Sequence, residues 1–129
     1  MKIRILAVLF LVFVLSVIVA ADMGVLAGPI RALYDFPNGD KLGHFCIYGL
    51  LAFLLAGAFP RPWQWGRLSV PIVTLALLIF SASEEYSQRF FPVRTADIWD
   101  LLCSWSGILL GTWLALRWKN IKIHDAAQD

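Results

Sequence analysis

Acidic side chains and one of the two histidines collect at the ends of apolar segments, where they could perform acid–base chemistry or hold an ion. A buried carboxylate can act as a general base, and histidine can act as its acid partner. His44, Glu85 and Asp100 are the catalytic candidates on these grounds. Most of the acidic residues fall in the same polar stretches, namely Asp22, Asp35, Asp40, Glu84, Glu85, Asp97 and Asp100. The acids are therefore concentrated rather than scattered.

Helical spacing arranges the polar residues in three stripes, because side chains three or four positions apart share one face of an α-helix. The stripes consist of Lys41, His44 and Tyr48; of Ser81, Glu84, Glu85 and Gln88; and of Asp97, Asp100, Ser104, Gly107 and Gly111. Between the second and third stripes Pro92 breaks the helix. Arg94, two residues later, can form a bidentate bond to a carboxylate or a phosphate.

We predict that the three stripes converge on one ligand-binding site. Its expected members are Asp40, Lys41, His44, Tyr48, Glu85, Gln88, Arg94, Asp100 and Ser104. The alternative is an interfacial ion network that only pins the helices together. Gly107 and Gly111 have the GxxxG spacing that lets two membrane helices approach closely, so we assign them to helix packing.

The composition predicts that these stripes lie on membrane-spanning helices. Hydrophobic residues make up 60% of the 129-residue chain and charged residues 16%, with a mean hydropathy of +0.73. An ordinary soluble protein is roughly 45–50% apolar and about 25% charged. A net charge of +2 supplies little affinity for nucleic acid through counterion release, so no nucleic-acid partner is expected.

Four apolar runs predict an all-α, polytopic membrane protein, a four-transmembrane-helix bundle formed by a single domain over residues 1–129. Each run approaches the roughly 17–25 residues that cross a bilayer. The predicted helices cover residues 5–21, 42–59, 68–88 and 98–118, and the predicted external loop covers residues 22–41. The first run could instead be a cleaved signal peptide, but its 17 residues exceed the usual apolar length of about 7–15. We therefore expect a retained helix.

The distribution of basic residues predicts the orientation. On this topology the N-terminus, the loop between the second and third helices and the tail carry 7 Lys and Arg residues, against 4 on the other side. Because cytoplasmic segments carry the excess of basic residues, both termini are expected in the cytoplasm. The polar site then lies on the outer face of the bacterial inner (cytoplasmic) membrane.

Three motifs in this order resemble the VanZ-like family of small bacterial membrane proteins. They are Asp40-Lys41-x-x-His44-x-x-x-Tyr48, then Glu85-x-x-Gln88-x-Phe90-x-Pro92-x-Arg94, then Asp100-x-x-x-Ser104-x-x-Gly107-x-x-x-Gly111. The resemblance implies a four-helix integral membrane protein of the cell envelope. Since the family's namesake is associated with low-level teicoplanin resistance, it also implies an effect on glycopeptide susceptibility. Ser104 departs from the family, which usually has Asn at this place.

Two functions stay open at this point, and we expect the first. In the first, a non-enzymatic envelope protein binds membrane lipid, an anionic headgroup or an envelope precursor through Arg94 and Lys41. Glu85 and Asp100 would orient those two cations. In the second, an intramembrane enzyme acts on a lipid-linked or peptidoglycan-related substrate through His44, Glu85 and Asp100.

Cofactors, metals and transport have weaker support. No cofactor is predicted and no metal site is assigned, although Asp40, His44, Glu85 and Asp100 could hold a divalent ion such as Mg²⁺ in the enzymatic alternative. Transport would require an oligomer or a small cavity, and the sequence has no broken-helix repeat that favours it.

Overall fold

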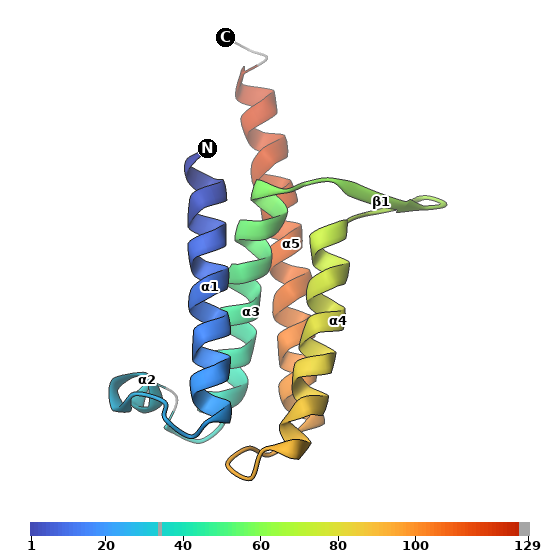
Figure 1. Ribbon diagram of the computed structural model, residues 1–129. Coiled ribbons are helices and arrows are strands. Elements are labelled where there is room, and N and C mark those ends of the chain that lie inside the picture. Colours follow the sequence, from blue (N-terminus) through green and yellow to red (C-terminus); the bar gives the residue numbers. More distant parts are fainter. Residues whose placement is uncertain (34, 127–129) are drawn as a thin grey trace.

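The computed structural model describes residues 1–33 and 35–126, with side chains described up to residue 120. Within these residues the order is α1 (Lys2–Asp22), α2 (Gly28–Ala32), α3 (Gly39–Ala58), β1 (Pro62–Trp65), β2 (Leu68–Pro71), α4 (Ile72–Ser87), a 3₁₀ turn (Gln88–Phe90) and α5 (Ile98–Ala126). Helices α1, α3, α4 and α5 run side by side (Figure 1). The start of α1 and the β-hairpin lie toward one end of this bundle, and α2 and the α4–α5 loop lie at the other.

Three helices are long and apolar enough to cross a membrane. They are Lys2–Asp22, Gly39–Ala58 and the first part of α5, Ile98–Asn120. These segments match three of the four predicted helices, each with small shifts at the ends. Large apolar side chains such as Leu9 and Val12 on α1 are exposed, as expected for a helix face that meets hydrocarbon rather than water.

The predicted helix over residues 68–88 is wrong at its start, and the all-α description must be corrected with it. Residues 68–71 form strand β2, which pairs with β1 as an antiparallel hairpin. Gly66 makes the turn with a φ of +59°, and the aromatic and β-branched residues on either side favour strands. Helix α4 begins only after Pro71 and ends at Ser87, which leaves it 16 residues.

Glycines bring α3 and α5 into direct backbone contact. A Cβ atom at Gly111 would overlap the carbonyl oxygen of Gly49, and one at Gly107 would overlap that of Phe45. Ala115, the next small residue of the stripe, is fully buried. Gly107 and Gly111 therefore lie in the contact between two helices, where only a residue without a side chain fits.

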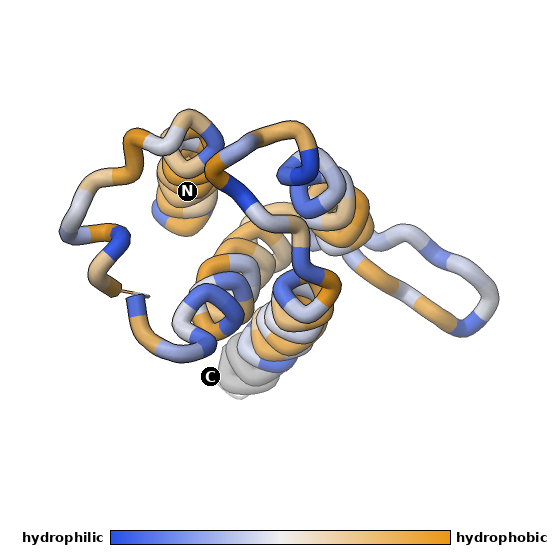
Figure 2. Tube along the Cα trace, turned by 90° about the horizontal axis from the view of Figure 1, so that it is seen from below, coloured by the Kyte–Doolittle hydropathy of each residue, from blue (hydrophilic) through white to orange (hydrophobic). Residues whose placement is uncertain are grey.

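Helices α1 and α4 both lie on one face of the α3–α5 pair, α1 beside α3 and α4 beside α5 (Figures 1 and 2). Helix α1 packs against α3 and buries Ala7 and Val14. The Thr74 hydroxyl of α4 lies 2.9 Å from the Thr112 hydroxyl of α5. Trp105 of α5 also donates its indole N–H to the backbone carbonyl of Leu78 in α4, at 3.2 Å. These contacts set the rotation of α4 about its own axis and so decide which of its polar side chains face the bundle.

A cavity with polar and apolar walls at the α2 end of the bundle

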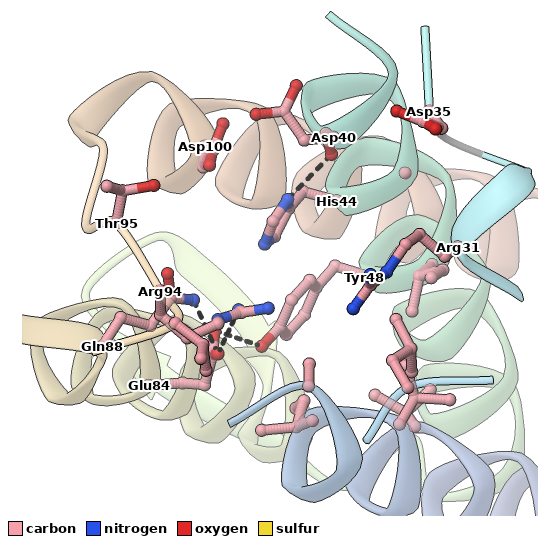
Figure 3. A pocket seen from close by; sticks show the side chains of 18 of the residues that line it. Arg31, Asp35, Asp40, His44, Tyr48, Glu84, Gln88, Arg94, Thr95 and Asp100 are labelled. Atoms are coloured by element: carbon pink, nitrogen blue, oxygen red, sulfur yellow. Dashed lines mark hydrogen bonds and ion pairs between the residues drawn. The ribbon is translucent and has the colours of Figure 1, made fainter. Parts of the chain in front are cut away.

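The polar stripes end around one cavity, at the end of the bundle that carries α2. Viewed from this end, hydrophilic residues gather at the near ends of α3, α4 and α5 (Figure 2). The cavity has a volume of about 530 Å³. Its polar wall consists of Arg31, Asp35, Asp40, His44, Tyr48, Glu84, Gln88, Arg94, Thr95 and Asp100 (Figure 3). Its apolar wall consists of residues from α1, α3 and the adjoining loops, among them Phe13, Val14, Val17, Ile18 and Ile47.

Glu84 is the centre of the polar wall. Its carboxylate accepts hydrogen bonds from the Gln88 amide at 2.8 Å, from the Arg94 guanidinium at 3.4 Å and from the Tyr48 hydroxyl at 3.5 Å. Glu84 is only 8% exposed and Gln88 only 2%. A buried carboxylate is stable when such partners surround it. This group of residues therefore links α3, α4 and the α4–α5 loop.

Arg94 joins this group to the first helix. Its Nε atom lies 3.5 Å from a carboxylate oxygen of Asp22 at the end of α1, while its Nη2 atom lies 3.4 Å from Glu84. The side chain of Asp22 is 14% exposed and that of Arg94 is 21% exposed. One cation thus faces two carboxylates from different helices, and its charge is already balanced inside the protein.

A second cation, Lys41, connects α3 to the start of α5. Its ammonium group lies 3.0 Å from Asp97, 3.2 Å from Asp100 and 3.4 Å from Asp40. Asp97 also accepts the backbone N–H of Trp99 at 2.9 Å, which caps the first turn of α5. This backbone hydrogen bond, followed by the bond from Lys41, lowers the pKa of Asp97 below its usual value. Lys41, like Arg94, therefore has its charge balanced by carboxylates.

His44 has a defined tautomer and a second nitrogen that faces the cavity. Its Nδ1 atom lies 2.8 Å from the backbone carbonyl oxygen of Asp40. A carbonyl oxygen can only accept, so Nδ1 must carry the proton, and Nε2 is then free to act as an acceptor when the ring is neutral. The ring stacks on Tyr48, with 6.4 Å between the ring centroids. Figure 3 shows the side chain extending from α3 toward the group around Glu84.

Glu85 lies beside Glu84 but has different neighbours. It is 6% exposed, and one of its oxygens accepts the backbone N–H of Asp97 at 2.6 Å. One potential ligand atom from each of three side chains, His44, Glu84 and Glu85, lies within 4.8 Å of the other two. Two carboxylates and an imidazole at this spacing are a donor set that could hold a divalent metal ion.

The family follows from comparison with known proteins. A family model described as VanZ/LLP1 matches residues 3–119. The chain belongs to this family. The match confirms the resemblance found in the three sequence motifs, and with the three long apolar helices it indicates a membrane protein. No curated protein and no solved structure matches the chain.

In this VanZ/LLP1 chain, most of the expected site residues do line the cavity. They are Asp40, His44, Tyr48, Gln88, Arg94 and Asp100. Lys41 stands beside the cavity, paired with Asp100. Glu85 is not among the lining residues, and neither is Ser104, which is buried one turn farther along α5.

One expectation about a single residue needs correction. The sequence hypothesis used Glu85 to orient a cation, but the acids that pair with Arg94 are Glu84 and Asp22. The sequence hypothesis did not assign Glu84 or Asp22 as a partner of Arg94. Glu84 could have been found, because it lies on the same helical stripe as Gln88. Asp22 was one of the acids at the ends of the apolar segments, but nothing in the sequence indicated its pairing with Arg94, because the two residues are far apart in the chain and the position of Asp22 depends on how α1 packs against α3.

Proposed function

We propose that the chain crosses the bacterial inner membrane four times, with both termini in the cytoplasm. The proposal adds α4 as a fourth span to the three long apolar helices. Sixteen residues of α-helix are roughly 24 Å long, and the hydrocarbon core is about 30 Å thick, so flanking residues must complete the crossing. Support comes from the arrangement in Figure 1, in which the hairpin and the α4–α5 loop lie at opposite ends of the bundle. A chain that leaves α3 at one face and enters α5 at the other must cross between them.

Cysteine labelling tests this topology. In a variant whose native Cys46 and Cys103 are replaced by alanine, Gly28→Cys on α2 and Gln64→Cys on the hairpin each introduce one thiol at an exposed position. We expect a membrane-impermeant maleimide to label the first in intact cells and the second only after permeabilisation. The opposite labelling pattern would show that the orientation is the reverse of the one proposed. Labelling of both positions from outside would remove α4 as a span.

We further propose that the protein binds a membrane lipid in the cavity, and the observation that carries this is the division of the cavity wall. Charged and hydroxyl groups of α3, α4 and the α4–α5 loop form one part, and the side chains of Val14, Val17 and Ile18 on α1 contribute to the other. A wall of this kind matches an amphiphile, whose headgroup can meet the polar part while an acyl chain lies along the apolar part. In this proposal, an effect on glycopeptide susceptibility is a consequence of lipid binding at the outer surface.

The charges around the cavity favour a headgroup that carries an ammonium group. Asp35 and Asp40 line the cavity and are exposed. Arg94 and Lys41, which the sequence hypothesis assigned to an anionic headgroup, are each paired with two or more carboxylates. Arg31 on α2 forms no ion pair with the described residues, and it is placed to meet a phosphate. A zwitterionic headgroup of the phosphoethanolamine type fits this arrangement.

Binding of acyl-labelled fluorescent lipids to the purified protein in detergent tests the proposal. Val17→Trp places a bulky side chain in the apolar part of the cavity, and Val12→Trp places the same side chain on an exposed part of α1 as a matched control. We expect Val17→Trp to weaken the binding of phosphatidylethanolamine by about tenfold or more, and Val12→Trp to leave it unchanged. Equal affinities of the two variants would contradict lipid binding in this cavity. If the wild type instead prefers phosphatidylglycerol, the hypothesis of an anionic headgroup replaces that of a zwitterionic one.

A further inference from the structure

The outer end of the bundle carries more negative charge than its own cations balance. The sequence on this side holds seven carboxylates against four Lys and Arg residues. Arg94 and Lys41 account for five of the carboxylates, namely Asp22, Glu84, Asp40, Asp97 and Asp100. Two remain, the exposed Asp35 and the buried Glu85, and among the described residues no Lys or Arg side chain lies within ion-pair distance of Glu85. A buried carboxylate without such a partner is normally protonated, hydrogen-bonded or bound to a metal.

We infer that His44, Glu84 and Glu85 form a binding site for one divalent transition-metal ion. Their donor atoms lie within 4.8 Å of one another, and both carboxylates are more than nine-tenths buried. Atoms bound to one ion at about 2.0–2.2 Å are at most about 4.4 Å apart, so a small rotation of these side chains suffices for coordination.

His44 and Glu85 each leave one ligand atom available, whereas both oxygens of Glu84 accept hydrogen bonds, one of them only from the Tyr48 hydroxyl at 3.5 Å, which the ion would replace. The Nδ1–H of His44 donates to the carbonyl oxygen of Asp40, which is the support that metal-binding histidines usually have. The Nε2 atom is thereby left to bind the ion. Glu85 uses one oxygen to accept the Asp97 N–H, and its other oxygen accepts no hydrogen bond from the described residues. The metal would hold this oxygen and replace the cation that Glu85 lacks.

The donor set also indicates the class of metal. One imidazole nitrogen with two carboxylate oxygens suits Mn²⁺ or Zn²⁺ better than Mg²⁺, which prefers oxygen ligands alone. Glu84 lines the cavity, and Figure 3 shows that both Glu84 and His44 point into it from different helices. Three protein ligands leave at least one coordination position for water or for an oxygen atom of a bound molecule.

Titration with Mn²⁺, followed by electron paramagnetic resonance in detergent without added lipid, tests the site. We expect one saturable Mn²⁺ per chain, displaced by Zn²⁺, and electron spin-echo modulation from one imidazole ¹⁴N. Glu85→Gln removes the charge but keeps an acceptor for the Asp97 N–H, and His44→Phe keeps a ring against Tyr48. Each should weaken Mn²⁺ binding by at least about tenfold, and His44→Phe should abolish the ¹⁴N modulation in any ion that still binds.

Asp35→Asn is the matched control, because it removes one carboxylate from the same cavity outside the cluster. It should change Mn²⁺ affinity by less than about twofold if the ion sits in the cluster, since exposed charges contribute little. An equal loss in all three variants would mean diffuse attraction to an acidic surface and would overturn the inference. So would the absence of saturable Mn²⁺ and Zn²⁺ binding by the folded wild type, or Mn²⁺ binding without ¹⁴N modulation. None of these outcomes bears on lipid binding, which is measured with other variants.

Discussion

Replacement of Gly111 by leucine is expected to separate α3 from α5 and to cost about 3 kcal/mol or more of the free energy of unfolding. A Cβ atom alone would overlap the carbonyl oxygen of Gly49. The obstacle is backbone rather than a flexible side chain, so neither helix can yield without moving as a whole. Overpacking a protein interior commonly costs 1–3 kcal/mol, and a forced helix displacement belongs at or above the upper end of that range. Unfolding in mixed micelles, followed by circular dichroism, measures the change.

Gly43→Ala is the control for this substitution. Gly43 also lies in one of the three long apolar helices, α3, but a Cβ atom there would meet nothing within 4 Å. Alanine is the better helix former by about 0.8–1.0 kcal/mol in a peptide, so the variant should be as stable as the wild type or slightly more stable. A Gly111→Leu protein as stable as Gly43→Ala would show that α3 and α5 do not meet through these glycines.

Loss of Arg94 is expected to have the second largest effect. In Arg94→Ala the carboxylates of Asp22 and Glu84 lose the cation between them, and both are largely buried. Removing one partner of a fully buried ion pair costs about 3–5 kcal/mol. Because the Arg94 side chain is 21% exposed, solvent screens part of this interaction, and we expect about 2–3 kcal/mol. The same unfolding assay measures it, and proteolysis of the loop between α1 and α3 should become faster.

Two further variants separate charge from packing. Arg89→Ala removes a neighbouring arginine that is exposed and, among the described residues, interacts through its guanidinium with the ring of Tyr86 alone. The free energy of unfolding of this variant should differ from that of the wild type by less than about 0.5 kcal/mol. Neutralising the whole group, with Arg94→Met, Asp22→Asn and Glu84→Gln together, should recover much of the stability lost in Arg94→Ala, because no unpaired charge remains buried. If Arg94→Ala behaves like Arg89→Ala, Arg94 does not fasten α1 to α4.

The helices could be predicted where one physical pattern dominated. The long apolar runs near residues 5–21 and 98–118 have no competing signal, and both are helical. The helix predicted over residues 68–88 starts late because the segment before Pro71 gains more from pairing with β1 than from extending a helix. A hairpin depends on a partner strand, and apolar periodicity within one segment carries no information about that partner.

The sequence predicted which residues gather around the polar site better than it predicted the role of each one. His44, Tyr48, Gln88, Arg94 and Asp100 share faces with suitable spacing, and all of them line the cavity. Glu84 and Glu85 lie on the same broad face of α4; the sequence hypothesis named Glu85, whereas Glu84 is the one that lines the cavity. Adjacent residues point about 100° apart on a helix. A modest rotation therefore decides which of the two acids faces the cavity.

Composition and residue spacing were enough to predict an apolar, largely helical chain of the VanZ/LLP1 family, with most of its acids at one end and a glycine contact between two helices. These properties depend on composition and on spacing within single segments. The pairing of Arg94 with Asp22 and Glu84, and the position of His44 beside both glutamates, became visible in the folded protein alone. These relations depend on the rotation of α4 and the docking of α1, which are set by packing contacts between helices that are distant in the chain.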